Sequence, residues 1–273
     1  MKVGVVVPGV TGRMGRLIAE AALDDDRHAL VGATARPGSA AVGQDVAALY
    51  GRPEAGVLVQ EHTEAALSAL SPAVKSGAVL IDFTLPGLCA VHADVAMRHG
   101  LGLIVGTTGL SPDDEAALAE ASAKVPVLVA SNTSLGANLL MALTGQATRA
   151  IPEADVEIVE LHHRGKRDAP SGTALSLARA SAEARDQDLD EVKRTAREGI
   201  APREAGEIGV FGVRGGDVPG EHTVYLFLEG ERIELTHRVL SRRIFALGAL
   251  RAARYLSGKP AGRYRMADVL GLG

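Results

Sequence analysis

The chain has 273 residues, of which 47% are hydrophobic and 23% charged, and its formal net charge is −4. This length favours two domains over one, and the composition excludes a wholly disordered protein. Because the net charge is small and negative, we expect neither a nucleic-acid partner nor a membrane surface. The single cysteine, Cys89, excludes an intrachain disulfide and a cysteine-based metal site and indicates a cytoplasmic location. No segment approaches about 18 uninterrupted apolar residues, so no signal peptide or transmembrane helix is expected.

Short apolar runs alternate with helical patterns in the first half of the chain. The runs predict strands at Lys2–Val7, Ala29–Thr34, Val79–Phe83, Gly102–Val105 and Val127–Ala130. The patterns between them predict helices at Arg16–Leu23, Leu88–His99 and Ser111–Ala123. Continuous apolar strands that alternate with helices are typical of an α/β fold, here a Rossmann-like doubly wound parallel sheet.

The pattern changes near residue 132 and predicts a second α+β domain. Helices are expected at Leu135–Arg149, Ser171–Arg185 and Arg243–Ser257, and strands at Asp155–Leu161, Glu207–Val213, His222–Glu229 and Arg232–Val239. A hairpin turn between the last two strands favours a mixed sheet. Every residue of Val224–Leu228 is apolar or aromatic, so both faces of that strand should be covered, one of them by helices or by another subunit.

A glycine-rich loop, GVTGRMG at residues 9–15, follows the first predicted strand and opens the first helix. Glycines allow such a loop to turn tightly and to approach a pyrophosphate at the helix N-terminus. The spacing departs from the usual G-x-G-x-x-G fingerprint. The loop therefore indicates a dinucleotide site, and a tight turn without a ligand is the alternative.

The residues after the second predicted strand bear on the choice of cofactor. An acid is expected there, about 20 residues beyond the glycines, to bind the ribose of NADH. Ala35, Arg36 and Pro37 stand there instead. Because an arginine can pair with a 2′-phosphate, we predict NADPH as the preferred cofactor and NADH as the second. A solvated surface arginine is the alternative.

Hydroxyl-rich loops follow two other predicted strands. Gly106–Gly109 has the sequence GTTG, and residues 130–134 have the sequence ASNTS. Ligands of parallel α/β sheets bind at the carboxyl ends of the strands. These loops should face the cofactor if the sheet is parallel, and are otherwise ordinary turn and N-cap residues.

The stretch from Glu160 to Leu175 has the richest chemistry. His162, His163 and three cations lie within six residues, and Ser171-Gly172-Thr173 opens a predicted helix just beyond them. Cations and a helix N-terminus directed at one place suit a small substrate with two carboxylates. Histidine exchanges protons near neutral pH, and lysine can stabilise developing negative charge or give a proton.

Other interpretations of this stretch compete. Adjacent histidines on a strand point to opposite faces, and no Cys, Glu or His partner stands at metal spacing, so no metal site is expected. The basic run is alternatively a solvated loop, and Ser171 a simple N-cap. The missing G-x-S-x-G motif disfavours a serine hydrolase. A second charged loop, Arg214–His222, either caps the substrate pocket or only turns the chain.

Together these motifs resemble the dihydrodipicolinate (4-hydroxy-tetrahydrodipicolinate) reductase family. The matching stretches are Gly12–Gly15, Phe83–Pro86, Gly106–Gly109, Glu160–Leu175, Arg214–His222 and Thr236–Leu256. They span nearly the whole chain in the expected order, and Glu160–Leu175 is the most specific. The resemblance implies NAD(P)H-dependent reduction of 4-hydroxy-tetrahydrodipicolinate to tetrahydrodipicolinate in diaminopimelate and lysine biosynthesis.

The resemblance also implies a domain organisation and a set of site residues. Residues 1–132, completed by 241–273, would bind the dinucleotide, and residues 133–240 would bind substrate and form a homotetramer. His162 and Lys166 take the positions of the acid/base pair, and either could give the proton. Substrate carboxylates would bind at His163, Lys166, Ser171, Gly172 and Thr173. The cofactor would bind at Gly9, Val10, Thr11, Gly12, Arg13, Met14, Arg36, Gly106, Thr107, Thr108, Ala130, Ser131, Asn132 and Thr133.

The chain departs from the family pattern at three positions near the cofactor. Ala35 replaces an acid, Leu85 an arginine or histidine, and Thr133 a phenylalanine, so the ratio of NADPH to NADH use is open. Two rival functions are a reductase of another small acid, such as a cyclic imine, and a non-enzymatic NADP(H) sensor. Activity with a panel of substrates at fixed NADPH distinguishes the first rival from the function that the resemblance implies. The intact His162 and Lys166 argue against the second, because a sensor needs no substrate pocket.

Overall fold

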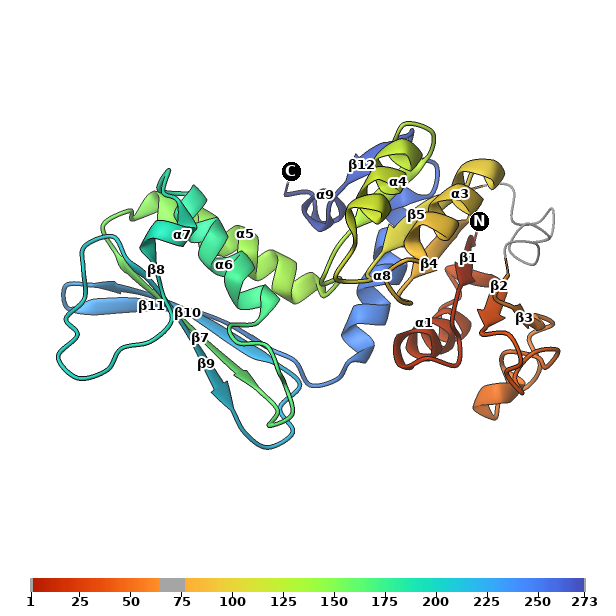
Figure 1. Ribbon diagram of the computed structural model, residues 1–273, viewed down its shortest axis with the longest axis horizontal. Coiled ribbons are helices and arrows are strands. Elements are labelled where there is room, and N and C mark those ends of the chain that lie inside the picture. The colour runs from red at the N-terminus through yellow and green to blue at the C-terminus, as the bar shows by residue number, and fades with distance from the viewer. Residues whose placement is uncertain (1, 64–76, 273) are drawn as a thin grey trace. The chain divides into compact units, whose positions relative to one another are not determined.

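The computed structural model describes residues 2–63 and 77–272 (Figure 1). The chain forms two compact units. Unit 1 extends to Ser134 and includes Arg243–Gly271, and unit 2 comprises Leu135–Arg242. No helix in the described ranges is both long and apolar enough to span a bilayer.

Unit 1 is built on a parallel sheet with the strand order β12-β6-β5-β4-β1-β2-β3. The strands are β1 Val3–Val7, β2 His28–Ala35, β3 Val59–Glu61, β4 Val79–Asp82, β5 Gly102–Val105, β6 Pro126–Val129 and β12 Gly262–Tyr264. Every strand pair is parallel, which confirms the predicted Rossmann-like sheet. The chain changes direction between β1 and β4, where such sheets bind ligands at the carboxyl ends of the strands.

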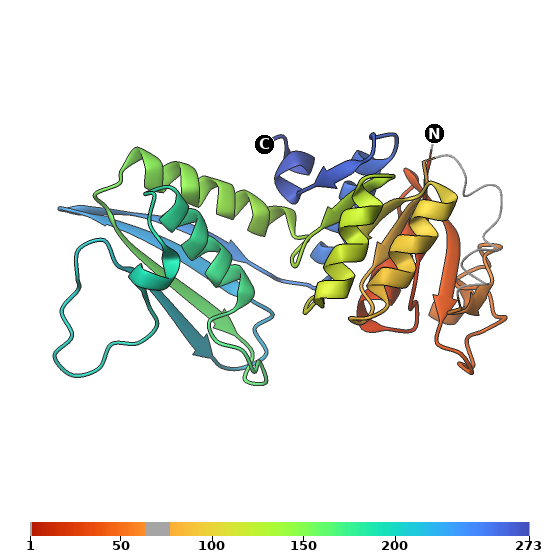
Figure 2. The same ribbon diagram turned by 45° about the horizontal axis from the view of Figure 1, so that its top comes forward.

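Helices cover both faces of this sheet, because its strands are apolar on both sides. The helices of unit 1 are α1 Arg13–Asp24, α3 Cys89–His99, α4 Pro112–Ser122, α8 Arg243–Leu256 and α9 Met266–Leu270, with a 3-10 turn at Ala48–Tyr50. Helices α3 and α4 lie on one face, and α1 and α8 on the other (Figure 2). Ser111 caps α4, since its hydroxyl accepts the N–H of Asp114 at the helix N-terminus.

Unit 2 contains the predicted mixed sheet, and its strand order is β11-β10-β7-β9-β8. Its elements are α5 Leu135–Ala150, β7 Asp155–His162, α6 Gly172–Glu183, α7 Leu189–Val192, β8 Lys193–Arg194, β9 Ile208–Arg214, β10 Glu221–Leu228 and β11 Glu231–Arg238. Strand β10 is antiparallel to β7 and β11, whereas β9 is parallel to β7 and β8. The core lies between the sheet and α6, where Ile158 and Leu226 contact Leu177 and its neighbours.

Strand β10 is covered on one face only. Val224 and Leu226 are buried toward the helices, whereas Phe227 on the other face is 39% exposed and stacks on Tyr225. No helix in the described part of the chain covers this second face, so of the two covers expected from the sequence another subunit remains. The strand register places Val159, Phe211, Val213, Tyr225 and Phe227 on this open sheet face, together with polar residues such as Glu157 and Thr223.

Candidate functional site

The glycine-rich loop of unit 1 lies tightly against the start of α1. Gly9 adopts a φ of +68°, which favours glycine, and a Cβ on Gly15 would lie only 2.2 Å from the carbonyl oxygen of Gly9. Gly12 is the N-cap and supplies no side-chain cap, so the first N–H groups of α1 remain open to an anion. This geometry fits the pyrophosphate of a dinucleotide.

The other predicted cofactor residues follow β2, β5 and β6, whose carboxyl ends share one edge of the sheet with the glycine loop. Arg36 is exposed directly after β2, and Thr108 and Ser131 are exposed after β5 and β6. Two of the predicted side chains are turned inward. Thr107 donates to the carboxylate of Asp82, and Thr133 is fully buried and donates to the carbonyl of Phe245 on α8. Their side chains thus support the loops from within.

An acid missed by the sequence analysis lies beside Arg36. Glu61 ends β3 and pairs with Ala35 across the parallel strands β2 and β3. Its carboxylate accepts the backbone N–H of Gly38 at 3.2 Å, two residues beyond Arg36. A carboxylate therefore lies near the end of β2, on the neighbouring strand β3.

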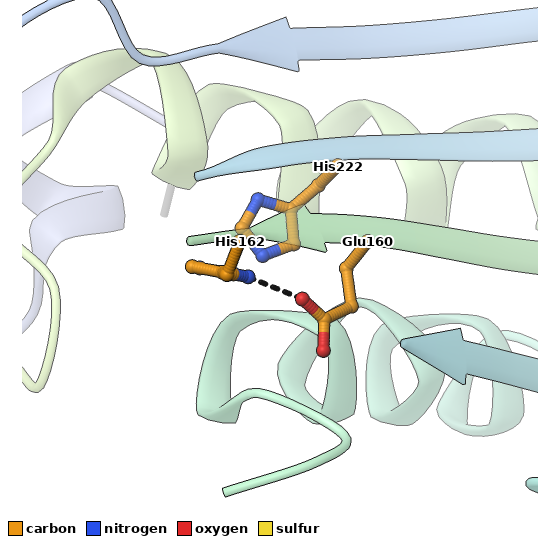
Figure 3. A group of neighbouring side chains, drawn as sticks. All are labelled: Glu160, His162 and His222. Carbon is orange, nitrogen blue, oxygen red and sulfur yellow. Dashed lines mark hydrogen bonds and ion pairs between the residues drawn. The ribbon is translucent and has the colours of Figure 1, made fainter. Parts of the chain in front are cut away.

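In unit 2, Glu160 is the centre of a buried ionic cluster (Figure 3). Its carboxylate accepts hydrogen bonds from Nδ1 of His162, from two guanidinium nitrogens of Arg214 at 2.8 and 3.1 Å, and from the backbone N–H of Ser171 at 3.2 Å. Burial favours the protonated acid, but the hydrogen bonds from Arg214 and His162 outweigh it and lower the pKa of Glu160. Glu160 is therefore ionised at neutral pH.

The surroundings of His162 select one charge state and one tautomer of its imidazole. Burial lowers its pKa, and the adjacent Glu160 carboxylate offsets only part of that effect, so the imidazole is neutral near pH 7. An ionised carboxylate can only accept a hydrogen bond, so Nδ1 of His162 carries the proton and Nε2 carries a lone pair. A Cβ on Gly220 would lie 2.9 Å from that Nε2, and the glycine leaves this space free.

His222 and Ser171 support the same cluster. Nε2 of His222 lies 3.0 Å from the hydroxyl of Ser171, and the His222 ring meets His162 edge to face at 5.3 Å between centroids. Burial lowers the pKa of His222 to about 4. The hydroxyl of Ser171 also accepts the N–H of Ala174 as the N-cap of α6. Because these partners occupy Ser171, the exposed Gly172 is the more open donor at this helix start.

Lys166 and His163 lie in the loop after β7. The ammonium of Lys166 contacts both carboxylate oxygens of Asp168 at 2.9 Å, which holds a side chain that is 19% exposed. His163 lines an open cavity of about 600 Å³ with Arg164, Gly216, Asp217 and Arg242. The cavity lining includes two cationic side chains, Arg164 and Arg242, beside the acidic Asp217.

The loop Arg214–His222 is part of the site and does not merely turn the chain. The N–H of Gly215 donates to the carbonyl of His162, and the N–H of His163 donates to that of Val218. Arg214 and His222 contribute side chains to the Glu160 cluster. Sequence reasoning assigned no role to Glu160, Arg214 or His222. The spacing of Glu160 and His162 along one strand predicts a shared face, whereas the other two depend on strand register.

The comparisons with known proteins cover both units. A family model described as dihydrodipicolinate reductase, N-terminus, matches residues 1–133, and its C-terminal counterpart matches residues 136–270. The chain belongs to the dihydrodipicolinate reductase family. The 4-hydroxy-tetrahydrodipicolinate reductases of Myxococcus xanthus and Anaeromyxobacter sp. are each 47% identical to it. The first covers 97% of both chains, and the second covers 99% of this chain and 98% of its own.

Solved structures show the same fold for this dihydrodipicolinate reductase family member. A dipicolinate-bound dihydrodipicolinate reductase from Paenisporosarcina sp. TG-14 aligns with a TM-score of 0.75 at 23% identity, over 98% of this chain and 99% of that one. An amine dehydrogenase from Mycobacterium smegmatis aligns with a TM-score of 0.58 at 16% identity, over 97% and 95% of the two chains. The resemblance inferred from the motifs is thereby confirmed.

The site of this family member contains a set of metal-capable groups that the sequence analysis did not find. One ligand atom each from Glu160, His162 and His222 lies within 4.8 Å of the others, so the argument that no Glu or His partner is near is wrong. However, Arg214 already neutralises Glu160 through two hydrogen bonds and would repel a cation. The cluster is therefore better suited to orienting His162 than to binding a metal ion.

Proposed function

We propose that this protein reduces 4-hydroxy-tetrahydrodipicolinate to tetrahydrodipicolinate with NAD(P)H, in diaminopimelate and lysine biosynthesis. The curated relatives at 47% identity carry the name of this reductase. One observation carries the proposal. Unit 2 contains the His162 imidazole, hydrogen-bonded to Glu160, the Lys166 ammonium, bound to Asp168, and the N-terminus of α6. The glycine loop of unit 1 supplies the matching dinucleotide site.

The cofactor is held, in this proposal, along the carboxyl edge of the unit 1 sheet. The N–H groups after Gly12 bind the pyrophosphate, and the guanidinium of Arg36 pairs with the 2′-phosphate of NADPH. Glu61 offers a carboxylate to the free 2′-hydroxyl of NADH. A bound reduced nicotinamide supplies the hydride. We propose NADPH as the preferred cofactor, with NADH accepted less well.

The substrate carboxylates bind at the start of α6, at Gly172 and Thr173, where the helix dipole favours an anion, with Lys166 adding positive charge and His163 lining the adjoining cavity. The ring nitrogen needs a proton when the hydride arrives. Nδ1 of neutral His162 is committed to Glu160, and its Nε2 carries a lone pair, so His162 accepts rather than donates. Lys166, which Asp168 holds in place, is then the proton donor.

We also propose that the protein forms a homotetramer. The open sheet face presents Val213 and Phe227, which are 49% and 39% exposed, together with Tyr225. An apolar sheet face of this kind is typical of a subunit contact. Sedimentation of the wild-type chain and of Phe227→Glu should show a tetramer and a smaller species, and a wild-type monomer would refute this assignment. The cytoplasmic location stays a prediction.

The experiment that tests the proposed function follows absorbance at 340 nm with enzymatically generated substrate and with NADPH or NADH. Oxidation of NADPH that pyridine-2,6-dicarboxylate inhibits supports the proposal. Turnover of a different cyclic imine and not of this substrate would identify the related-reductase alternative. Binding of NADPH without any loss of absorbance in the presence of substrates would favour the sensor alternative.

A further inference from the structure

A chain of polar side chains lies at the carboxyl ends of the strands in unit 1, away from the Glu160 cluster. Thr34 is the penultimate residue of β2, His62 follows β3, His92 lies on α3 and Asp82 ends β4. Oγ1 of Thr34 is 2.8 Å from Nδ1 of His62, the two Nε2 atoms of His62 and His92 are 3.3 Å apart, and Nδ1 of His92 is 2.8 Å from Asp82. Thr34, His92 and Asp82 are fully buried.

These hydrogen bonds have one consistent direction when both imidazoles are neutral. Burial favours protonated Asp82, but hydrogen bonds from His92 and Thr84 lower its pKa, so the carboxylate is ionised and can only accept. Nδ1 of His92 therefore donates to Asp82, and Nε2 of His92 accepts from His62. Nδ1 of His62 then accepts the hydroxyl proton of Thr34. Each of the four side chains thus has a hydrogen-bond partner of the right kind in its neighbour.

Both ends of this chain are attached to loops that face the proposed cofactor. At one end, Asp82 accepts the backbone N–H and the hydroxyl of Thr84 at 2.8 and 2.6 Å, and the hydroxyl of Thr107 at 3.1 Å. At the other end, the carbonyl of Thr34 accepts the N–H of Val10 in the glycine loop at 3.0 Å. The loops after β4 and β5 are thus connected by these side chains to Thr34, whose backbone holds the loop after β1.

We propose that the Thr34–His62–His92–Asp82 chain positions the cofactor-binding loops of unit 1, so that its members act as positioning residues for NADPH. The inference rests on the proposed function, because it presumes a dinucleotide at this edge. A buried His–Asp pair is a weak source of stability, since desolvation of the carboxylate opposes the gain from pairing. What it does supply is orientation, because hydrogen-bonded groups hold a fixed geometry that apolar packing does not impose.

Two pairs of variants test the chain. His92→Leu removes the donor to Asp82 and the contact with His62, whereas His92→Asn retains an amide donor near the position of Nδ1. Thr34→Val removes the hydroxyl at nearly constant volume, and Thr34→Ser retains it. Thr144→Val is a matched control, because Thr144 is equally buried but its hydroxyl bonds only the carbonyl of Leu140 within α5 of unit 2.

The primary measurement is the Kd for NADPH from nicotinamide fluorescence, with KM and kcat measured alongside. We expect His92→Leu to raise the Kd and KM about tenfold and Thr34→Val about threefold, as lost positioning hydrogen bonds predict, with kcat at saturating NADPH nearly unchanged. His92→Asn should recover part of the loss and Thr34→Ser most of it. Thr144→Val should bind NADPH as the wild type does.

The outcomes separate this inference from the proposed function. A wild-type protein without affinity for NADPH refutes both. Wild-type binding that is unchanged in both His92→Leu and Thr34→Val refutes only the positioning role. If His92→Leu does not fold, the two Thr34 variants provide the test. Equal losses of NADPH affinity in Thr34→Val and Thr34→Ser would overturn the inference, because the hydroxyl would then be irrelevant.

Discussion

Glu160 and His162 lie two residues apart on β7, and the Glu160 carboxylate accepts the Nδ1 proton of His162. The contact forms because alternate residues of a strand share a face, and here that face is buried. An ionised carboxylate on Nδ1 selects the tautomer in which Nε2 carries a lone pair. The protonation state of the proposed catalytic histidine therefore depends on a neighbour that is itself fully buried.

Replacing Glu160 tests this dependence. In Glu160→Gln the charge that raises the pKa of His162 is gone, so burial lowers that pKa further. We expect kcat to fall by about 10- to 100-fold and the acid limb of the kcat profile to move to lower pH. Kinetics between pH 5 and 9 measure both. An unchanged profile would show that Glu160 does not set the titration of His162.

Lys166 is the proposed proton donor, and His162 is the proposed proton acceptor. Lys166→Ala and His162→Ala should each lower turnover by about 10²–10⁴-fold if they act in proton transfer, with the fold intact. Lys259→Ala is a control, because the ammonium of Lys259 lies over the ring of Tyr255 in unit 1 and has no proposed role in the reaction. Circular dichroism checks folding. Near-normal rates in both site variants would contradict the assignment.

Arg36 and Glu61, near the end of β2, should determine the choice between NADPH and NADH. Arg36→Ala should weaken NADPH more than NADH, because only NADPH carries the 2′-phosphate. Glu61→Gln should shift the preference toward NADPH, because the carboxylate repels that phosphate. Ratios of kcat/KM for the two cofactors measure both effects. Equal losses for both cofactors in Arg36→Ala would count against a phosphate contact.

His222 should make the stability of the protein sensitive to acid. Its pKa is lowered to about 4 by burial, so the unfolded chain binds a proton near pH 6.5 that the folded chain does not take up until about pH 4. Stability contributed by the neutral form is therefore present above pH 6.5 and lost as the pH falls toward 4, by up to about 3 kcal/mol.

Urea unfolding at pH 7.5, 5.5 and 4.5 measures this loss. His222→Gln lacks the titrating group, and its amide can still reach Ser171, so its stability should change less over the same range. An equally steep loss in the variant would assign the effect to other groups. Glu160 and Asp82, whose pKa values are lowered, lose their contribution at still lower pH.

Much of the fold is predictable because it depends on local pattern. Continuous apolar strands such as Gly102–Val105 and the capping box at Ser111 specify the parallel sheet and its helices within short windows. Short elements were missed. Strands β3 and β12 have three residues each, too few for periodicity, and exist because a neighbouring strand offers a free edge. What covers the second face of β10 was left open between helices and another subunit, because apolar residues do not tell which molecule covers them.

The sequence alone determined the fold class, the family and a contiguous stretch of reactive residues from His162 to Thr173, because each depends on neighbours along the chain. Only the tertiary structure decided what orients them. Arg214 reaches Glu160 across 54 positions, and His222 reaches Ser171 across 51, through the register of β7 with β9 and β10. Likewise, Thr34, His62, Asp82 and His92 meet only where strands and a helix converge at one sheet edge. Such contacts follow from packing between distant segments, which no local pattern encodes.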